Sequence, residues 1–419
     1  MLRSIFGLKL TFVSGALCVA LTLFACTPES APREDVALQF LISPTATSSA
    51  QPHLAVSPGG QVVLSWLNPD HSGVTLYSSM LDHAQWGAPS RVASGDNWFV
   101  NWADFPSVVP LEDDLWAAHW LVKKDGGTYS YDISLALSQD AGASWSAAVI
   151  PHRDNTPTEH GFVSLFSHRG GAAAVWLDGR NAGGAGHDHG ASTAQMTLRS
   201  AVLGRDLTLS NEALLDERVC DCCQTDAAQT PAGPLVVYRD RSADEVRDIS
   251  IASATSAGWD APRPLSEDGW EISGCPVNGP AIASFGSAVA TAWYTGADDQ
   301  ARVRFARSDN GGVTFAPPVQ VDGDQALGRV DVVVMPDGSA AVSWIRRDGP
   351  ERGTLMVRRI DVDGVVGLAH RLIEISPSRA SGFPQMVLRG ADLVFAWTEV
   401  EASTTTVRTA LLTDALSRL

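Results

Sequence analysis

The chain has 419 residues, a formal net charge of −17 at pH 7 and 45% hydrophobic residues. Such an acidic balance argues against nucleic acid or an anionic membrane surface as a partner. The apolar content is ample for a packed globular core.

Residues 1–25 are predicted to be an export signal. Arg3 and Lys9 precede an apolar run that reaches Ala25 and is too short and too interrupted for a membrane span. The run ends in Leu23-Phe-Ala-Cys26, which resembles the bacterial lipobox, where the signal is cut before a cysteine that is then lipidated. Cys26 is therefore the predicted lipidation site. The open alternative is an ordinary secretory leader with a chance cysteine.

Residues 26–35 are polar and Pro-rich, as expected of a tether. Thr27 follows the cysteine, which in Gram-negative lipoproteins would suggest sorting to the outer membrane. The predicted partner at this end is the lipid bilayer, reached through Cys26. The predicted location is the cell envelope, and the outer membrane if the organism is Gram-negative.

Residues 36–419 carry a sevenfold internal repeat, in which a short apolar strand ends in an aromatic residue every 51 to 62 residues. The seven aromatic residues are Trp66, Trp120, Trp176, Tyr238, Trp293, Trp344 and Trp397. A repeat of strands and turns at about this period is typical of a β-propeller with one four-stranded blade per unit. The sequence therefore predicts an all-β fold, a seven-bladed β-propeller in one domain.

Each unit divides into four strands, of which the second carries the aromatic residue. The first strand is a short apolar stretch, as at 162–166 and 281–285, and a turn with Gly or Asp follows it. The last unit has room for a third strand from residue 406 but little beyond it. Because a circular propeller must close, we expect residues 36–42 to supply the missing outer strand.

Two turns between the third and fourth strands match the pattern S-x-D-x-G-x-T/S-W. They are Ser138–Trp145, with Asp140, and Ser308–Phe315, with Asn310 in place of Asp. The Asp or Asn side chain is expected to bond turn amides, and the Gly to adopt a left-handed backbone.

These turns resemble the Asp box of sialidase-like propellers, and from the second to the seventh unit the chain is similar to that superfamily. The resemblance implies a six-bladed sialidase-type propeller as the alternative fold. It also implies an exo-acting glycoside hydrolase with three arginines on the substrate carboxylate, a Tyr activated by Glu, and an Asp as acid/base. The departures are the seven units, the lack of an Arg-Ile-Pro segment near residues 51–53, and no Tyr/Glu pair identifiable by motif.

The loops before the fourth and fifth units contain Cys220, Cys222, Cys223 and Cys275. Adjacent blades would bring these loops together at the axial mouth, so we expect one cysteine cluster. Disulfide bonding is one interpretation, favoured by an oxidising compartment. A soft-metal site for copper or zinc is the other, since thiolate and imidazole ligands suit these ions.

The metal interpretation would recruit histidines of the third unit. His160 lies in the loop before its first strand, and His187 and His189 lie in a Gly-flanked loop after its second strand. The alternative for His187 and His189 is a solvated, flexible segment.

A second group of candidate site residues begins at the aromatic residue of the fourth unit. Tyr238, Arg239, Asp240 and Arg241 place arginines beside carboxylates, which suits recognition of a carboxylate or phosphate group. In the hydrolase hypothesis these four would lie near the reacting sugar. A surface salt-bridge cluster is the structural alternative. A set of arginines repeated in the third strands, which includes Arg247, is better explained by a structural role.

Three functions remain open. The first is an anchored propeller that binds a small-molecule, glycan or metal ligand at its axial mouth through a Cys/His soft-metal site. The second is a sialidase-type glycoside hydrolase. The third is a disulfide-braced structural scaffold.

Overall fold

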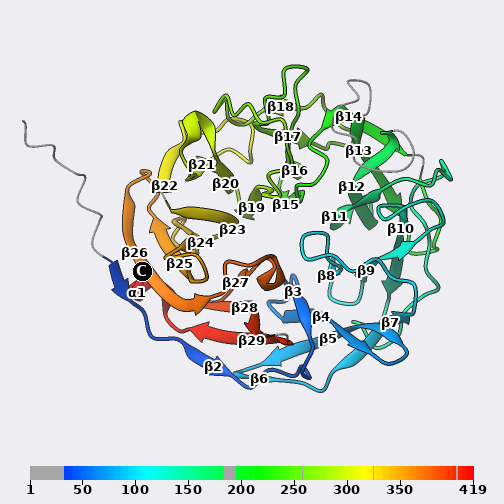
Figure 1. Cartoon of the computed structure of the whole chain (residues 1–419), viewed down its shortest axis with the longest axis horizontal. Coiled ribbons are helices and arrows are strands. Elements are labelled where there is room, and N and C mark those ends of the chain that lie inside the picture. The colour runs from blue at the N-terminus through cyan, green and yellow to red at the C-terminus, as the bar shows by residue number, and fades with distance from the viewer. Residues whose placement is uncertain (1–32, 183–194, 211, 257, 324, 403) are drawn as a thin grey trace, which may run out of the picture. The chain divides into compact units, whose positions relative to one another are not determined.

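The computed structural model describes residues 33–419 except 183–194, 211, 257, 324 and 403. Its sheets are arranged as seven blades around a central axis (Figure 1). The predicted seven-bladed propeller is therefore confirmed, and the six-bladed alternative is wrong. Each of the seven repeated aromatic residues lies in the second strand of its blade, as the repeat predicts.

Within each blade the chain starts next to the axis and runs outward (Figure 1). Blade 1 comprises β3 (Ala50–Val56), β4 (Val62–Asp70), β5 (Gly73–Asp82), β6 (Gln85–Trp86) and β7 (Ser90–Gly95). Blade 2 comprises β8 (Ser107–Pro110), β9 (Trp116–Lys123) and β10 (Tyr131–Ser138). Blade 3 comprises β11 (His160–His168), β12 (Gly171–Asn181), β13 (Gln195–Leu203) and β14 (Ala213–Val219).

The remaining blades follow the same order. Blade 4 comprises β15 (Asp226–Thr230), β16 (Gly233–Arg239), β17 (Ile249–Ser253) and β18 (Arg263–Pro264). Blade 5 comprises β19 (Ala281–Phe285), β20 (Ala288–Thr295), β21 (Arg302–Ser308) and β22 (Val319–Gly323). Blade 6 comprises β23 (Ala326–Val334), β24 (Ala340–Arg347), β25 (Gly353–Ile360) and β26 (Val366–Ile375). Blade 7 comprises β27 (Gln385–Arg389), β28 (Asp392–Glu401) and β29 (Thr404–Leu412).

The ring closes through an N-terminal strand. β2 (Gln39–Leu41) pairs antiparallel with β29, with Phe40 opposite Ala410, so the predicted donor segment 36–42 is confirmed. β1 (Arg33–Asp35) adds in parallel to the outer edge of β26, within the segment predicted to be a tether. Short helices η1 (Ala297–Asp299), η2 (Arg379–Ser381) and α1 (Ala415–Arg418) complete the fold. Among the described residues, no helix is long and apolar enough to span a bilayer.

The hydrophobic core lies between neighbouring blades. Trp176 of β12 packs against blade 2 residues such as Ile133, whereas Val175, on the opposite face of the same strand, packs against blade 4. This follows from strand geometry, in which successive side chains point to opposite faces of a sheet. Each blade thus buries both faces, which accounts for the apolar second strands.

Three of the repeated aromatic residues also form polar bonds across blades. Each donates from its ring N–H or O–H to an aspartate of the preceding blade. The bonds join Tyr238 to Asp216 (2.6 Å), Trp293 to Asp268 (2.6 Å) and Trp344 to Asp322 (2.7 Å). A buried hydroxyl or indole N–H needs such a partner, so the aromatic repeat fixes blade contacts as well as filling the core.

The two turns predicted to use Asp140 and Asn310 form the expected hydrogen bonds. Asp140 Oδ1 accepts the backbone N–H of Ser144 at 2.8 Å, and Asn310 Oδ1 accepts that of Thr314 at 3.0 Å. Trp145 packs against the core between blades 1 and 2. Each turn is therefore ordered by its own side chains.

Replacing Gly142 in the first turn with alanine is expected to lower the free energy of unfolding by about 2–4 kcal/mol. Gly142 has a φ of +84°, and a Cβ there would lie 2.8 Å from the ring of Trp116. Gly60 is the matched control, because its φ is +83° and a Cβ would meet nothing within 4 Å. Gly60→Ala should cost only about 1 kcal/mol. Equal melting temperatures for the two variants would contradict this account.

Candidate functional site

The two cysteine loops lie side by side next to blade 4, one on each side of it in chain order. The first connects β14 to β15 and the second connects β18 to β19. The side chain of Gln224 in the first loop accepts the backbone N–H of Gly279 in the second at 3.1 Å. A Cβ on Gly279 would lie 2.1 Å from the carbonyl oxygen of Gln224, so only glycine permits this approach.

Arg239, at the end of β16, joins both loops. Its backbone oxygen accepts the N–H of Cys220 at 3.0 Å. Its guanidinium donates to the carbonyl oxygens of Asn278, Arg247 and Tyr294 at 2.6 to 3.0 Å. The side chain is buried and lies over the ring of Trp270. Arg239 therefore has a structural role, in which it holds the two cysteine loops together. Its guanidinium donates to carbonyl oxygens of the chain itself.

The four cysteines meet at this junction. Cys222 and Cys275 form a disulfide with Cα atoms 6.0 Å apart, and Cys220 and Cys223 are thiols. The Sγ atoms of Cys220 and Cys223 lie 3.2 Å apart, and both side chains are buried. The sulfurs of Cys220, Cys222 and Cys223 all lie within 4.8 Å of one another. The structure thus brings together all four cysteines that the sequence places in neighbouring loops.

A chain of ion pairs leads to Cys220. Arg247 donates to Cys220 Sγ at 3.3 Å and to Glu245 at 2.9 Å. Glu245 also binds Arg241 at 2.7 Å, and Arg241 binds Asp221 at 3.1 Å. The guanidinium of Arg247 therefore offers positive charge to a buried sulfur.

These surroundings shift the pKa values of the two thiols in opposite directions. Burial alone would raise the pKa of Cys220, but the Cys223 thiol and the Arg247 guanidinium outweigh burial and lower the pKa to about 6. Burial and the neighbouring Cys220 sulfur raise the pKa of Cys223 well above its usual value. The surroundings therefore favour the thiolate form at Cys220 and disfavour it at Cys223.

His160 lies in a different cluster. Its ring stacks on that of His152 at a centroid distance of 3.8 Å, and its Nε2 lies 3.3 Å from Asp154. Its Nδ1 donates to the carbonyl oxygen of Tyr131 in blade 2 at 3.2 Å. Burial opposes the charged form, but Asp154 and Asp178 outweigh burial and raise the pKa of His160.

Among the described residues, the groups close enough to share a metal ion place His160 with Asp132 and His152, or with Asp154 and Asp178, and not with the cysteines. The reason lies in the blade geometry, since His160 faces blade 2 and the cysteine cluster lies on the blade 4 side of blade 3. His187, His189 and Cys26 lie outside the described residues.

The four residues predicted to surround a reacting sugar point in different directions. Tyr238 is fully buried against blade 3 through Asp216, and burial raises its pKa well above the usual value. Arg239 faces blade 5, and Arg241 is paired with Asp221 and Glu245. Asp240 accepts the hydroxyl of Ser250 at 3.2 Å, and burial raises its pKa. None of these four residues lines the axial channel described below.

A cavity of about 860 Å³ forms an axial channel that is lined by the first strands of all seven blades. Its lining, within the part of the chain described, omits the four predicted catalytic residues and the cysteines, but includes Gln224 and Gly279 of the cysteine loops. The cluster therefore lies beside the channel wall and not in the channel.

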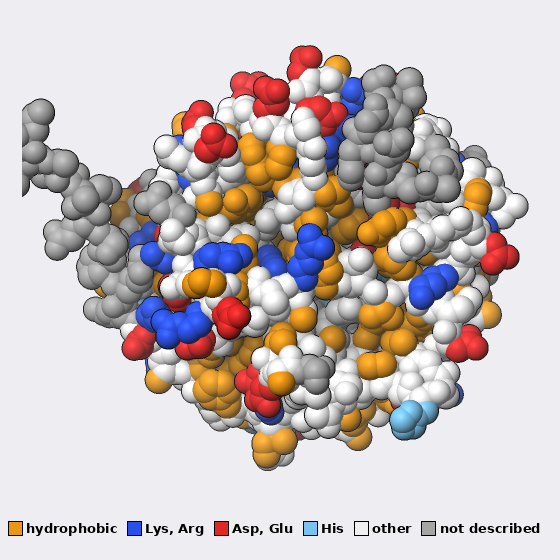
Figure 2. Space-filling view, viewed as in Figure 1, with side chains coloured by type: hydrophobic (Ala, Val, Ile, Leu, Met, Phe, Trp, Pro, Cys, Tyr) orange, Lys and Arg blue, Asp and Glu red, His pale blue; other side chains and the backbone are white. Residues whose placement is uncertain are grey.

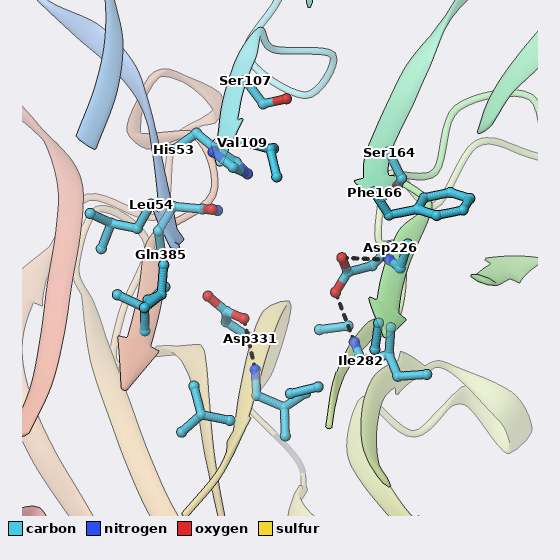
Figure 3. A pocket seen from close by; sticks show the side chains of 18 of the residues that line it. His53, Leu54, Ser107, Val109, Ser164, Phe166, Asp226, Ile282, Asp331 and Gln385 are labelled. Atoms are coloured by element: carbon cyan, nitrogen blue, oxygen red, sulfur yellow. Dashed lines mark hydrogen bonds between the residues drawn. The ribbon is translucent and has the colours of Figure 1, made fainter. Parts of the chain in front are cut away.

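Three aspartates line this channel, one buried (Asp104) and two partly buried, and each accepts a backbone N–H of the next blade. The pairs are Asp104 with Phe162 (2.8 Å), Asp226 with Ile282 (2.8 Å) and Asp331 with Met386 (2.6 Å). Figure 3 shows Asp226 and Asp331 reaching into the channel. Burial raises the pKa of Asp104 and Asp226 to about 7 and that of Asp331 to about 8.

Aromatic and arginine side chains gather at one end of the channel. Trp102 stacks on Phe383 with ring centroids 5.7 Å apart, and the guanidinium of Arg329 lies over Trp102. Burial and the charges of Arg347 and Arg379 lower the pKa of Arg329 to about 10. Figure 2 shows Lys or Arg side chains near the centre of the face in view, on an acidic protein.

Sequence reasoning missed Arg247 and the channel aspartates. Arg247 was assigned a structural role because arginine recurs at its strand position, but its neighbour here is a cysteine. The position of Arg247 in the sequence could have indicated this contact. Arg247 directly follows the loop that contains Arg241 and Glu245, and Arg241 pairs with Asp221 of the cysteine loop. Asp226 and Asp331 each lie in the first strand of a blade. Aligning the repeats would have shown an aspartate in the first strand of both units.

Comparison with known proteins supports the fold. No protein-family profile matches the chain, and no curated protein matches its sequence. A protein of unknown function from Dyadobacter fermentans has 13% identity and a TM-score of 0.51, over 91% of this chain and 98% of the other. A Penicillium chrysogenum α-L-arabinanase has 14% identity and a TM-score of 0.47, over 92% and 99%.

A Streptococcus pneumoniae sialidase has 11% identity and a TM-score of 0.42, over 92% of this chain and 70% of the other. At these identities a structural likeness concerns the fold alone, and of these three structures only the Dyadobacter fermentans protein reaches a TM-score of 0.5. Fold and site together define the chain as a seven-bladed propeller with a buried cysteine cluster beside its axial channel.

Proposed function

We propose that this protein binds a soft metal ion, Cu(I) in the first place, at the thiols of Cys220 and Cys223. The observation that carries the proposal is the gathering of the sulfurs of Cys220, Cys222 and Cys223 within 4.8 Å of one another in a buried position. Thiolate sulfur is the ligand type that selects Cu(I) and zinc.

Two features favour Cu(I) over zinc. Structural zinc sites take four ligands, and among the described residues the set that could share an ion contains only three sulfurs, of which Cys222 is held in the disulfide. The second feature is charge. A Cu(I) ion bound by two thiolates leaves one net negative charge in a buried site. Arg247, 3.3 Å from Cys220 Sγ, supplies the compensating positive charge. A bound histidine is not required by this proposal.

The test is anaerobic reconstitution of the purified protein with Cu(I), followed by removal of loosely held metal. We expect about one Cu(I) per chain, and loss of that copper in Cys220→Ser and Cys223→Ser. Cys275→Ser is the matched control, because it makes the same replacement in the cluster and keeps both thiols. A wild-type protein that retains no Cu(I) would contradict this proposal.

We also propose that the mature chain is exported and held in the cell envelope by a lipid on Cys26. The support is the leader and its four-residue match to the lipobox. Labelling of cells with a radioactive or clickable palmitate should mark the wild type but not Cys26→Ser. A labelled Cys26→Ser protein, or an unlabelled wild type, would show that Cys26 is not the anchor.

Glycoside hydrolysis of the sialidase type is the second candidate. The specific observation in its favour is that Asp226 and Asp331 line the channel with raised pKa values of about 7 and about 8. A carboxylic acid that stays protonated near neutral pH is what a glycosidase needs to protonate a leaving group.

Turnover of fluorogenic sialosides and other exo-glycosidase substrates tests this candidate. If it is correct, the wild type hydrolyses one of them, and Asp331→Asn loses the activity while keeping its fold. If the wild type hydrolyses none of these substrates, the hydrolase candidate fails. The channel aspartates then serve only to bind backbone N–H groups of the next blade.

A further inference from the structure

The disulfide of this cluster joins an inner sulfur to an outer one. Cys222 is 8% exposed and belongs to the three-sulfur set with Cys220 and Cys223. Cys275 is only partly buried, on the second loop. In the disulfide form Cys222 cannot act as a thiolate ligand, so the site offers two thiols where three sulfurs lie within reach.

We infer that the Cys222–Cys275 disulfide is a redox gate on the metal site, and that its reduction by an external dithiol adds Cys222 as a third sulfur ligand. The inference rests on the proposed function and adds its regulation. The gate separates a two-thiol state, Cys220 with Cys223, from a three-thiol state.

The chemistry of opening is a two-electron thiol–disulfide exchange. A thiolate of the dithiol attacks Cys275 Sγ, the more exposed sulfur; the bond to Cys222 breaks, and Cys222 leaves as a thiolate. The second thiol of the reductant then attacks the mixed disulfide and releases Cys275. The dithiol is oxidised to its disulfide, both cysteines are reduced, and the two protons of the dithiol balance the two thiolates released.

The released Cys222 should stay in place, because the loops are held together by more than the disulfide. Gln224 accepts the N–H of Gly279, and the guanidinium of Arg239 holds the carbonyl of Asn278 at 2.9 to 3.0 Å. Cys220 is tied to β16 through its N–H. Reduction therefore changes the number of available thiolates while the surrounding backbone keeps its contacts.

The test compares Cu(I) affinity in competition with a chromophoric chelator, under nitrogen, for the disulfide form and for protein reduced with a dithiol and then freed of reductant. We expect the reduced protein to bind Cu(I) at least about tenfold more tightly, which corresponds to about 1.4 kcal/mol. Thiol counting should show two more reactive thiols after reduction.

Two variants separate loss of the disulfide from gain of the ligand. Cys275→Ser and Cys222→Ser both break the disulfide, but only Cys275→Ser leaves the Cys222 thiol. We expect Cys275→Ser to bind like the reduced wild type in both conditions, and Cys222→Ser to bind like the disulfide form in both. Melting temperatures of the two variants should fall by similar amounts, which would exclude stability as the cause of the difference.

The outcomes distinguish the gate from the function. If the reduced wild type binds Cu(I) and the disulfide form binds it equally well, or if the two variants bind alike, the gate is wrong and the metal site stands. If neither redox form binds Cu(I), the proposed function fails and the gate fails with it.

Discussion

Replacing Arg239 with alanine is expected to lower the free energy of unfolding by about 3 kcal/mol, because three buried carbonyl oxygens lose their donor. The guanidinium is shared by the carbonyls of Asn278, Arg247 and Tyr294, and the residue is only 2% exposed. Contact with the Trp270 ring is lost as well. Thermal or urea unfolding of the purified variant measures the effect.

Arg408→Ala is the matched control. Arg408 is an arginine of the outer part of blade 7 with a side chain 46% exposed, and its ion pair is with Glu399 at 2.7 Å. Its loss should cost about 0–1 kcal/mol. If Arg239→Ala proves as stable as Arg408→Ala, Arg239 does not have this structural role. An Arg239 variant that stayed folded and hydrolysed a sialoside less well would instead revive its assignment to a substrate site.

Raising the pH from about 5 to about 9 is expected to remove the stability that three channel aspartates contribute. Burial raises the pKa of Asp104, Asp226 and Asp331 from 3.8 to about 7, about 7 and about 8. Between pH 4 and these values the folded protein holds protons that the unfolded chain lacks. The stabilisation is therefore complete below about pH 4 and is lost as the pH rises through 7 and 8.

Asp331→Asn isolates the contribution of one group, since an amide does not titrate. The variant loses stability overall, because an amide offers one oxygen where the carboxyl accepts the N–H groups of both Val332 and Met386. From pH 5 to pH 9 its melting temperature should rise relative to that of the wild type, because only the wild type loses the contribution of Asp331. His160, whose pKa is also raised, changes stability in the same direction in both proteins and cancels in the comparison. A difference in melting temperature between the two proteins that stays constant from pH 5 to pH 9 would contradict the titration described.

The architecture could be predicted because it is repetitive. Seven aromatic residues at similar intervals identify seven blades, and a truncated last unit identifies the need for an N-terminal strand, which β2 supplies. The parallel strand β1 was not predicted, because a three-residue polar strand at an edge has no apolar pattern. The gathering of Cys220, Cys222, Cys223 and Cys275 follows from the same repeat.

Side-chain direction could not be predicted from loop position. Successive residues of a strand face opposite neighbours, so Tyr238 bonds to blade 3 and Arg239 to blade 5, although they are adjacent in sequence. Tyr238 is itself one of the seven repeated aromatic residues, and this already indicated a structural role. His160 is close to the cysteine loop in blade order but faces the other side of its blade.

The pairing of the cysteines also required coordinates. Four cysteines allow three pairings, and sequence alone left them open. The structure selects Cys222 with Cys275 and leaves Cys220 beside Cys223, with Arg247 as the nearby cation. The cluster therefore contains both a disulfide and a pair of thiols, so the disulfide and metal-site hypotheses are compatible.

The most direct measurement of the central claim is X-ray absorption at the copper edge on the full-length protein loaded with Cu(I) under nitrogen. The account predicts a first coordination shell made only of sulfur, which disappears in Cys220→Ser and Cys223→Ser. A shell of nitrogen and oxygen, or the same spectrum in the wild type and both variants, would contradict it.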